Sequence, residues 1–202
     1  MKYAKPLFYN HAKEKDFQTA LKSRVNDYFS SRDLSTKASP LMWVKTILYI
    51  ALYYGTWATL ALQTHTPTIT VSLMIFFAIM TILLAFNVCH DAVHQAISGN
   101  KNIDHWIFYL TFNLLGPNAY LWKIRHNNAH HFFVNIPGSD MDIDGTDMIR
   151  VAPHKEWKPF HRFQHFYCGL LYSIFTMHWI LVKDFKIFRM KTFGNVTDLK
   201  HS

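Results

Sequence analysis

Two short histidine clusters are the residues of this sequence best suited to chemistry. The first reads His-Asp-Ala-Val-His, from His90 to His94, and the second reads His-Asn-Asn-Ala-His-His, from His126 to His131. Histidines four apart on a helix share one face, and neutral imidazoles bind iron, copper and zinc. A lone pair is weak in a chain with 13 histidines, but a pair followed at once by another histidine, beside a second cluster, is specific. The two clusters, which hold His90, His94, His126, His130 and His131, therefore predict a transition-metal site.

The remaining histidines are less informative. His161 and His165 are also four apart, but they lie outside the two clusters, so metal ligation and simple packing are equally good interpretations. Three others are expected to be interfacial or packing residues: His105, His154 and His178.

Acidic residues alternate in the loop that follows the second cluster, at Asp140, Asp142 and Asp144. The simplest interpretation is a solvated loop that caps the next helix. Carboxylates near a metal also accept hydrogen bonds from the second nitrogen of a ligand imidazole. We therefore name Asp91 and Asp142 as candidates for supporting the metal ligands, and Asn135, whose amide oxygen can also accept a hydrogen bond, as a third.

Long uncharged segments indicate a membrane protein. Residues 69–88 hold twenty positions without a charge, enough for a helix to cross a bilayer. Residues 163–182 are also uncharged, and residues 41–62 form a third candidate that is weakened by Lys45, whose ammonium can reach the nearby interface. Three such helices are improbable in a small soluble domain. We expect an all-α fold, with integral membrane helices and a cytoplasmic helical cap that carries the histidine clusters.

The other segments complete this organisation. Apolar residues at intervals of four predict an amphipathic helix over residues 12–30. The apolar stretch 106–122 is broken by Gly116 and Pro117, which predicts a segment that enters the membrane and returns. We predict four regions: an N-terminal helix and linker (1–40), a transmembrane hairpin (41–88), a region with both clusters (89–162) and a third apolar span with a tail (163–202).

The formal charge of +8 fits a membrane orientation better than nucleic-acid binding, because no stripe of basic and aromatic residues is present. Eight Lys/Arg lie in residues 1–40 and seven in residues 89–162, whereas the link 63–68 has none. The positive-inside rule then places the N-terminus and both clusters in the cytoplasm. Lys183, Lys186, Arg189 and Lys191 follow this segment and conflict with an outward crossing of residues 163–182, so the topology of that segment stays open.

With these clusters, the chain resembles the membrane fatty acid desaturases. The first histidine box of that family has the form His-Asp-Ala-x-His, as at His90–His94 here. The second cluster, followed by Phe-Phe-Val-Asn135 and the acidic run to Asp144, is similar to the bacterial acyl-CoA or linoleoyl-CoA branch. The boxes are specific to the superfamily, and the weaker likeness extends over nearly the whole chain.

The resemblance implies an oxygen-dependent oxidoreductase that inserts a cis double bond into a fatty acyl chain. It implies iron as cofactor, in a di-iron centre held by the five cluster histidines. Its substrate would be an acyl-CoA or a membrane acyl-lipid, within the lipid bilayer. An external ferredoxin or cytochrome b5 would supply two electrons, since no His-Pro-Gly-Gly heme motif occurs. The implied location is a bacterial inner membrane.

One part of the family pattern is absent. Members carry a third box with two adjacent histidines, and no His-His pair follows His131 in this sequence. Five imidazoles are too few for two irons. The expectation is an N-terminal portion of a desaturase that is inactive alone, with the ligands of the second iron missing from this chain.

Three alternatives remain open. A related membrane di-iron hydroxylase or ketolase would use similar boxes. A membrane metal transporter would carry histidines inside its spans, whereas the clusters here lie beyond them. A non-enzymatic metal-binding remnant would also be consistent with the missing third box.

Overall fold

The structure, a computed structural model, describes residues 15–190, 192–193 and 196–197. Helices dominate these residues, and the predicted all-α fold is confirmed. The chain divides between Leu115 and Gly116 into two compact units, here called the N-terminal and the C-terminal unit. The division falls inside the predicted region 89–162, so the two histidine clusters lie on different units.

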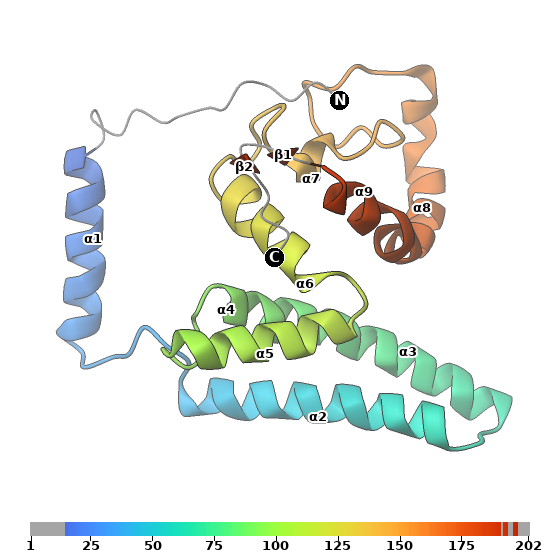
Figure 1. Cartoon of the computed structure of the whole chain (residues 1–202), viewed down its shortest axis with the longest axis horizontal. Helices are drawn as coiled ribbons and strands as arrows, with labels where there is room; N and C mark the ends of the chain where they lie inside the picture. Colours follow the sequence, from blue (N-terminus) through green and yellow to red (C-terminus); the bar gives the residue numbers. More distant parts are fainter. Residues whose placement is uncertain (1–14, 191, 194–195, 198–202) are drawn as a thin grey trace. The chain divides into compact units, whose positions relative to one another are not determined.

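The N-terminal unit is built from helices only, among its described residues. They are α1 (Lys15–Ser30), α2 (Pro40–Leu62), α3 (Pro67–Leu84), the π-helix η2 (Ala85–Cys89), α4 (His90–Val93) and α5 (Lys101–Leu114). Both α2 and α3 begin with proline, whose fixed φ suits the first helical position. Together they form a hairpin (Figure 1).

The core of this unit lies where α3 continues through η2 into α4. The π-helix η2 packs against α2 and α5, and α4 also packs against α5. The side chains at this contact are buried: Leu84, Val88, Cys89, Ala92, Phe108 and Phe112. The Cys89 thiol also lies 3.1 Å from the Thr111 hydroxyl of α5. Burial of this segment fixes the base from which the first histidine box projects.

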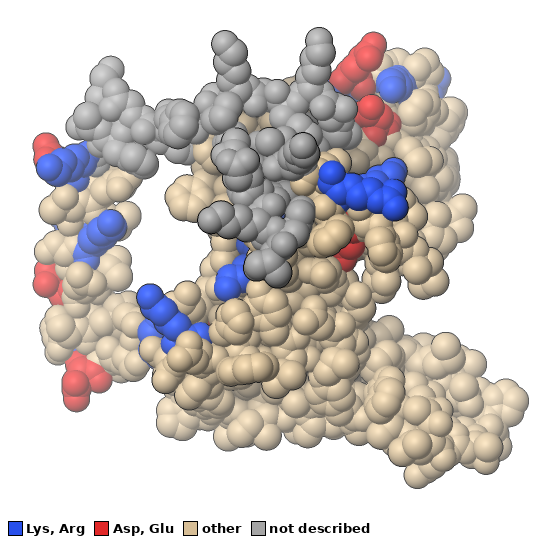
Figure 2. Space-filling model, in the orientation of Figure 1, with Lys and Arg blue, Asp and Glu red and all other residues tan. Residues whose placement is uncertain are grey.

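Two continuous helices are long and apolar enough to cross a membrane by length and composition, Pro67–Val93 and Pro159–Phe188. They contain the predicted segments 69–88 and 163–182. Apolar side chains of α3 such as Ile75 and Ile79 are exposed. No charged side chain is visible where α2 and α3 meet (Figure 2), because residues 46–90 contain no Lys, Arg, Asp or Glu.

The predicted segment 41–62 is helical as well, as α2 (Pro40–Leu62). Lys45 was expected to reach toward the membrane surface. Its ammonium donates a hydrogen bond to Oδ1 of Asn87 in η2, at 3.2 Å. This contact ties the first apolar helix to the segment that leads into the first histidine box.

The C-terminal unit carries shorter helices and one small hairpin. Its helices are α6 (Ala119–Ile124), the π-helix η3 (Arg125–His130), α7 (Met141–Asp144), the 3-10 helix η4 (Pro159–Phe163), α8 (Gln164–His178), the π-helix η5 (Trp179–Lys183) and α9 (Asp184–Phe188). The strands β1 (Thr192–Phe193) and β2 (Val196–Thr197) pair antiparallel. Figure 1 shows α8, η5 and α9 as one run of helix with a bend.

A turn at Gly116 precedes α6, where the sequence predicts a helix break. Gly116 has a φ of 108°, a conformation that L-residues rarely adopt. The Asp184 carboxylate then anchors α6, because it accepts hydrogen bonds from the Asn118 backbone N–H (2.6 Å) and from the Trp179 indole N–H (2.9 Å). The start of the helix with the second histidine box is thereby held against α9.

Candidate metal centre

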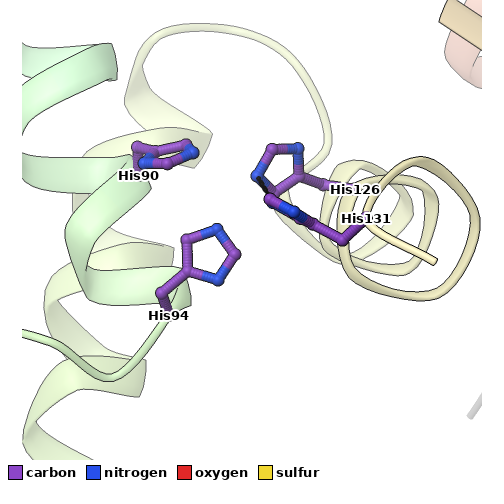
Figure 3. Close-up of side chains that lie close together, drawn as sticks. All are labelled: His90, His94, His126 and His131. Atoms are coloured by element: carbon purple, nitrogen blue, oxygen red, sulfur yellow. Dashed lines mark hydrogen bonds between the residues drawn. The ribbon is translucent and has the colours of Figure 1, made fainter. Parts of the chain in front are cut away.

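The first histidine box lies on α4 at the end of a long helix. His90 and His94 are one turn apart, and their ring centroids are 4.7 Å apart. Each offers a ring nitrogen within 4.8 Å of the other, and Figure 3 shows both rings on the same side of the helix. The spacing of four therefore produces the pair that it predicts.

A left-handed cap ends the helix directly after His94. Gln95 has a φ of 57°, and the next N–H groups return to the helix, from Gln95 to Ala92 O (3.0 Å) and from Ala96 to Asp91 O (3.0 Å). This bond pattern is a Schellman motif. Lys37 reinforces it by donating to the Gln95 carbonyl at 2.6 Å. The cap places His94 at the C-cap position, directly after Val93, the last residue of α4.

The second box lies on the π-helix η3, which changes its geometry. The His131 N–H donates to the His126 carbonyl five residues earlier, at 3.0 Å. In this wider turn the rings of His126 and His131 come together, with 2.9 Å between their Nε2 atoms (Figure 3). Trp122 stacks on the His126 ring with a centroid distance of 4.2 Å. A π-turn inside a longer helix is frequent at functional sites.

This pairing differs from the expectation of a His126–His130 pair with shared ligand atoms. His130 does lie beside His126, with ring centroids 5.8 Å apart, but its Nδ1 faces a carboxylate, Asp140, at 3.2 Å. A spacing of four puts two residues on one face only in an α-helix, and here the turn contains one residue more. The sequence holds no obvious signal for that extra residue.

Asp140 is a carboxylate beside a box histidine that the named supporting candidates did not include. Its side chain is fully buried, at 0% exposure, and it is the N-cap of α7. It accepts backbone hydrogen bonds from Asn135 (2.8 Å) and Asp142 (3.0 Å). Burial alone would raise its pKa, but these bonds and His130 together hold the pKa of Asp140 below its ordinary value. The capping role of the acidic loop was predicted; the contact with His130 was not.

The three predicted supporting residues have different surroundings. Asp91 Oδ1 lies 4.0 Å from His90 Nδ1, at the limit of an ion pair. Asp142 lies closer to its histidine, with 3.4 Å between its carboxylate and His130 Nδ1. Asn135, by contrast, contributes its backbone N–H to Asp140 and has a φ of 61°. The ligand atoms of His130, Asp140 and Asp142 all lie within 4.8 Å of one another.

Arg125 contacts both α7 and η5, the π-helix between α8 and α9. Its Nε lies 3.6 Å from the Asp142 carboxylate, and its guanidinium lies 5.0 Å from the ring centroid of Trp179. Burial lowers the pKa of Arg125, and the surrounding carboxylates oppose that shift. The arginine thus ties α7 to the helix that carries the second box.

His161 has a structural environment. Its Nδ1 accepts from the Lys158 backbone N–H (3.1 Å), and its Nε2 lies 2.9 Å from the Asp147 carbonyl, which requires Nε2 to carry the proton. Both nitrogens are therefore engaged with backbone. His165 is exposed and packs against Phe166 at a centroid distance of 4.0 Å. Neither histidine belongs to a candidate metal group among the described residues.

None of the remaining predicted histidines belongs to a candidate metal group among the described residues. His105 stacks on Tyr109 in α5, with ring centroids 4.4 Å apart. His178 is exposed at the end of α8, and His154 is exposed in the loop before η4.

Comparison with known proteins decides the family. The sequence model of the fatty acid desaturases matches residues 66–200, which include both histidine boxes. The chain belongs to the fatty acid desaturase family. The recognition made from the boxes is thereby confirmed.

Several curated desaturases are similar to this chain. The sn-1 linoleoyl-lipid 6-desaturase of Synechocystis sp. is 32% identical over 83% of this chain and 46% of its own length. The enzyme of the same description from Arthrospira platensis is 30% identical, over 81% of this chain and 44% of its own length. The acyl-lipid (8-3)-desaturase of Physcomitrium patens is 23% identical, over 94% and 40%.

The chain therefore spans about half the length of the curated relatives it matches. No solved structure is significantly similar to it.

Proposed function

We propose that this chain holds iron with its two histidine boxes and takes part in the oxygen-dependent desaturation of a fatty acyl chain in a membrane lipid. The ligands would be His90 and His94 from the first box and His126, His130 and His131 from the second. The observation that carries the proposal is the pair of Nε2 atoms of His126 and His131, 2.9 Å apart on one turn.

The donor set fits iron. Two nitrogens that each lie about 2.1 Å from one ion at near-tetrahedral or smaller angles are roughly 3 Å apart, close to the separation of the His126 and His131 nitrogens. Neutral imidazole is a ligand type suited to iron, although it also suits zinc and copper. The family match favours iron within that group. A di-iron centre would need further ligands beyond these five imidazoles.

Iron bound in this way would supply the activation of dioxygen that removal of two acyl hydrogens requires. The residues of this chain have other tasks. The long helix Pro67–Val93 would bring His90 to the membrane surface, because its apolar length ends at the first box. The buried contact of η2 with α5 keeps that helix end rigid. Rigid supports of this kind position a catalytic group without further conformational cost.

The names of the relatives favour an acyl-lipid substrate over acyl-CoA, since the Synechocystis and Arthrospira proteins are linoleoyl-lipid desaturases. We propose an external electron donor, ferredoxin or cytochrome b5. We also propose location in a bacterial inner membrane with the N-terminus and both boxes in the cytoplasm, on the basis of the charge distribution in the sequence.

Metal binding is the direct test of the ligand set. The full chain is purified in detergent micelles after expression with iron, and iron per chain is measured. His90→Ala and His126→Ala should each lower iron content at least tenfold. The matched control is His105→Ala, an exposed histidine outside the boxes that should leave iron unchanged. Equal iron in all four proteins would refute the ligand set.

The reaction is tested separately, in host membranes that contain linoleoyl-lipids. The chain is expressed alone and together with the part of the Synechocystis relative outside the matched region. Fatty acids are then analysed for a new double bond. We expect product in the second case and its loss in His126→Ala. A hydroxylated fatty acid as the sole product would favour the related hydroxylases instead.

A further inference from the structure

The carboxylate of Asp140 is placed to control the orientation of one proposed iron ligand. His130 Nδ1 lies 3.2 Å from Asp140 Oδ1, and the Asp140 side chain is fully buried. A buried carboxylate that is ionised accepts hydrogen bonds only, so the nitrogen that faces it must carry the proton. The second nitrogen of His130, Nε2, then has the lone pair that a metal needs.

We propose that Asp140 is a positioning residue that fixes the His130 tautomer and ring orientation so that Nε2 binds the iron. The inference rests on the ligand role proposed above for His130. It goes beyond that role because it assigns a task to a carboxylate that is not itself a ligand.

The surroundings of Asp140 make it a rigid support. Its Oδ2 accepts from the Asn135 N–H (2.8 Å), and its Oδ1 also accepts from the Asp142 N–H (3.0 Å). These bonds orient the carboxylate through the backbone at both ends of the loop. Asn135 adopts a left-handed φ of 61°, which bends the chain so that its N–H reaches the carboxylate. The loop therefore holds the oxygen that faces His130 in one place.

Asp142 is less suited to this task. Its carboxylate lies 3.4 Å from His130 Nδ1, but its side chain is 39% exposed and it also lies 3.6 Å from the Arg125 Nε. Water and the arginine compete for its oxygens. It provides an internal comparison, because it is an aspartate at a similar distance from the same nitrogen without the buried backbone anchors.

The test measures metal affinity in the full chain. Cobalt(II) is titrated into the protein in detergent micelles, and its visible absorption reports the ligand field. Asp140→Asn should weaken cobalt affinity 10- to 100-fold, as loss of a carboxylate behind a ligand imidazole typically does. It should also alter the absorption spectrum while the stoichiometry at saturation is unchanged. Asp142→Asn should weaken affinity less, and the exposed Asp147→Asn should match the wild type.

A double variant separates positioning from a general structural role. If Asp140 acts through His130, Asp140→Asn should weaken cobalt binding no further in a His130→Ala background. Additive losses would overturn the proposal and indicate that Asp140 only stabilises the loop. Loss of one bound metal at saturation would overturn it too, because Asp140 would then be a direct ligand of a cation held with His130 and Asp142.

The same measurements distinguish the positioning role of Asp140 from the metal site on which that role depends. Unchanged cobalt binding in both His126→Ala and His130→Ala would refute the metal site itself. Weakened binding in those variants, together with wild-type affinity and spectrum in Asp140→Asn, would refute only the positioning role.

Discussion

At the scale of residues, residue types and their spacing predicted the candidate site better than they predicted the side-chain contacts within it. The five box histidines were identified from the sequence, and His90 and His94 pair as their spacing indicates. The partner of His126 was not predictable, because the extra residue of η3 brings His131 to it. The contact of Asp140 with His130 was not predicted for a related reason. The burial of Asp140 depends on how the loop folds back on η3, and the local sequence does not encode that fold.

His161 should act as a structural residue. Its two ring nitrogens bond to the backbone of Lys158 and Asp147. His161→Ala would leave these partly buried backbone groups without that partner, so we expect a loss of about 1–3 kcal/mol in the free energy of unfolding. Iron content should be unaffected. Chemical denaturation in mixed micelles and metal analysis would measure the two effects.

The matched control for that variant is His165→Ala, four residues later and exposed. It should change stability by less than about 0.5 kcal/mol. Loss of iron in His161→Ala without loss of stability would restore the alternative role of His161 as a ligand.

Asp147 should show a pKa that depends on one lysine. Lys155 Nζ lies 3.2 Å from its carboxylate, and this hydrogen bond and charge lower the pKa of Asp147. A lowered pKa in the folded state favours folding above the ordinary value, and that contribution is lost as pH falls through the folded-state pKa. Lys155→Gln should raise the pKa of Asp147, as followed by NMR of the labelled carboxyl carbon.

Salt provides an independent check, because the Asp147 side chain is 73% exposed. High salt screens exposed ion pairs and should raise the pKa of Asp147 in the wild type. The control Lys158→Gln should raise it less, since Lys158 acts on Asp147 only through its charge. An equal effect of the two lysine variants would contradict the direct hydrogen bond.

At the scale of elements, long uncharged segments predicted the apolar helices, and the glycine–proline pair at residues 116–117 predicted the helix break. Residues 69–88 and 163–182 lie within the two long apolar helices, and the helix is interrupted around Gly116. The π-helices were not predicted. Each inserts only one residue per turn into a longer helix, too little to alter the apolar pattern of an 18-residue window.

Gly116 should be the less replaceable of two glycines. Its φ of 108° disfavours any side chain, and a Cβ there would lie 2.5 Å from Ile180 Cδ1. We expect Gly116→Ala to destabilise the protein by about 1–2 kcal/mol. The control Gly55→Ala lies within α2 with no atom within 4 Å of the new Cβ, and it should stabilise by up to about 1 kcal/mol. Thermal unfolding in micelles compares the two, and equal midpoints would contradict the strained turn.

At the scale of the whole molecule, composition predicted a membrane protein, and the family and the two apolar helices indicate membrane association. The division after Leu115 was not predicted. It is set by which helices bury side chains against one another, and the hydropathy pattern continues across residues 106–122 without a boundary other than the turn.

Charge placed on α3 should impair membrane insertion. Ile75 and Ile79 are exposed, so lysine at both positions would meet the bilayer interior, at about 2.5–3.5 kcal/mol per lysine near a helix centre. We expect the double variant Ile75→Lys with Ile79→Lys to be depleted from the alkali-resistant membrane fraction. The control Thr19→Lys, exposed on α1, should remain there. Undiminished insertion of the double variant would argue that this face of α3 is covered by protein.

The wide turn of η3 makes one position in the second box dispensable. His126 and His131 are joined by a five-residue backbone hydrogen bond, and the exposed Asn128 lies between them. Deleting that asparagine would remove one residue from this helical turn and leave an ordinary α-turn. In an α-turn, residues four apart share a face. The same two rings would still meet, and His130 would still precede the second of them by one residue. Relatives that differ by one residue in this box can thus present equivalent imidazoles, and a spacing mismatch alone does not exclude homologous ligands.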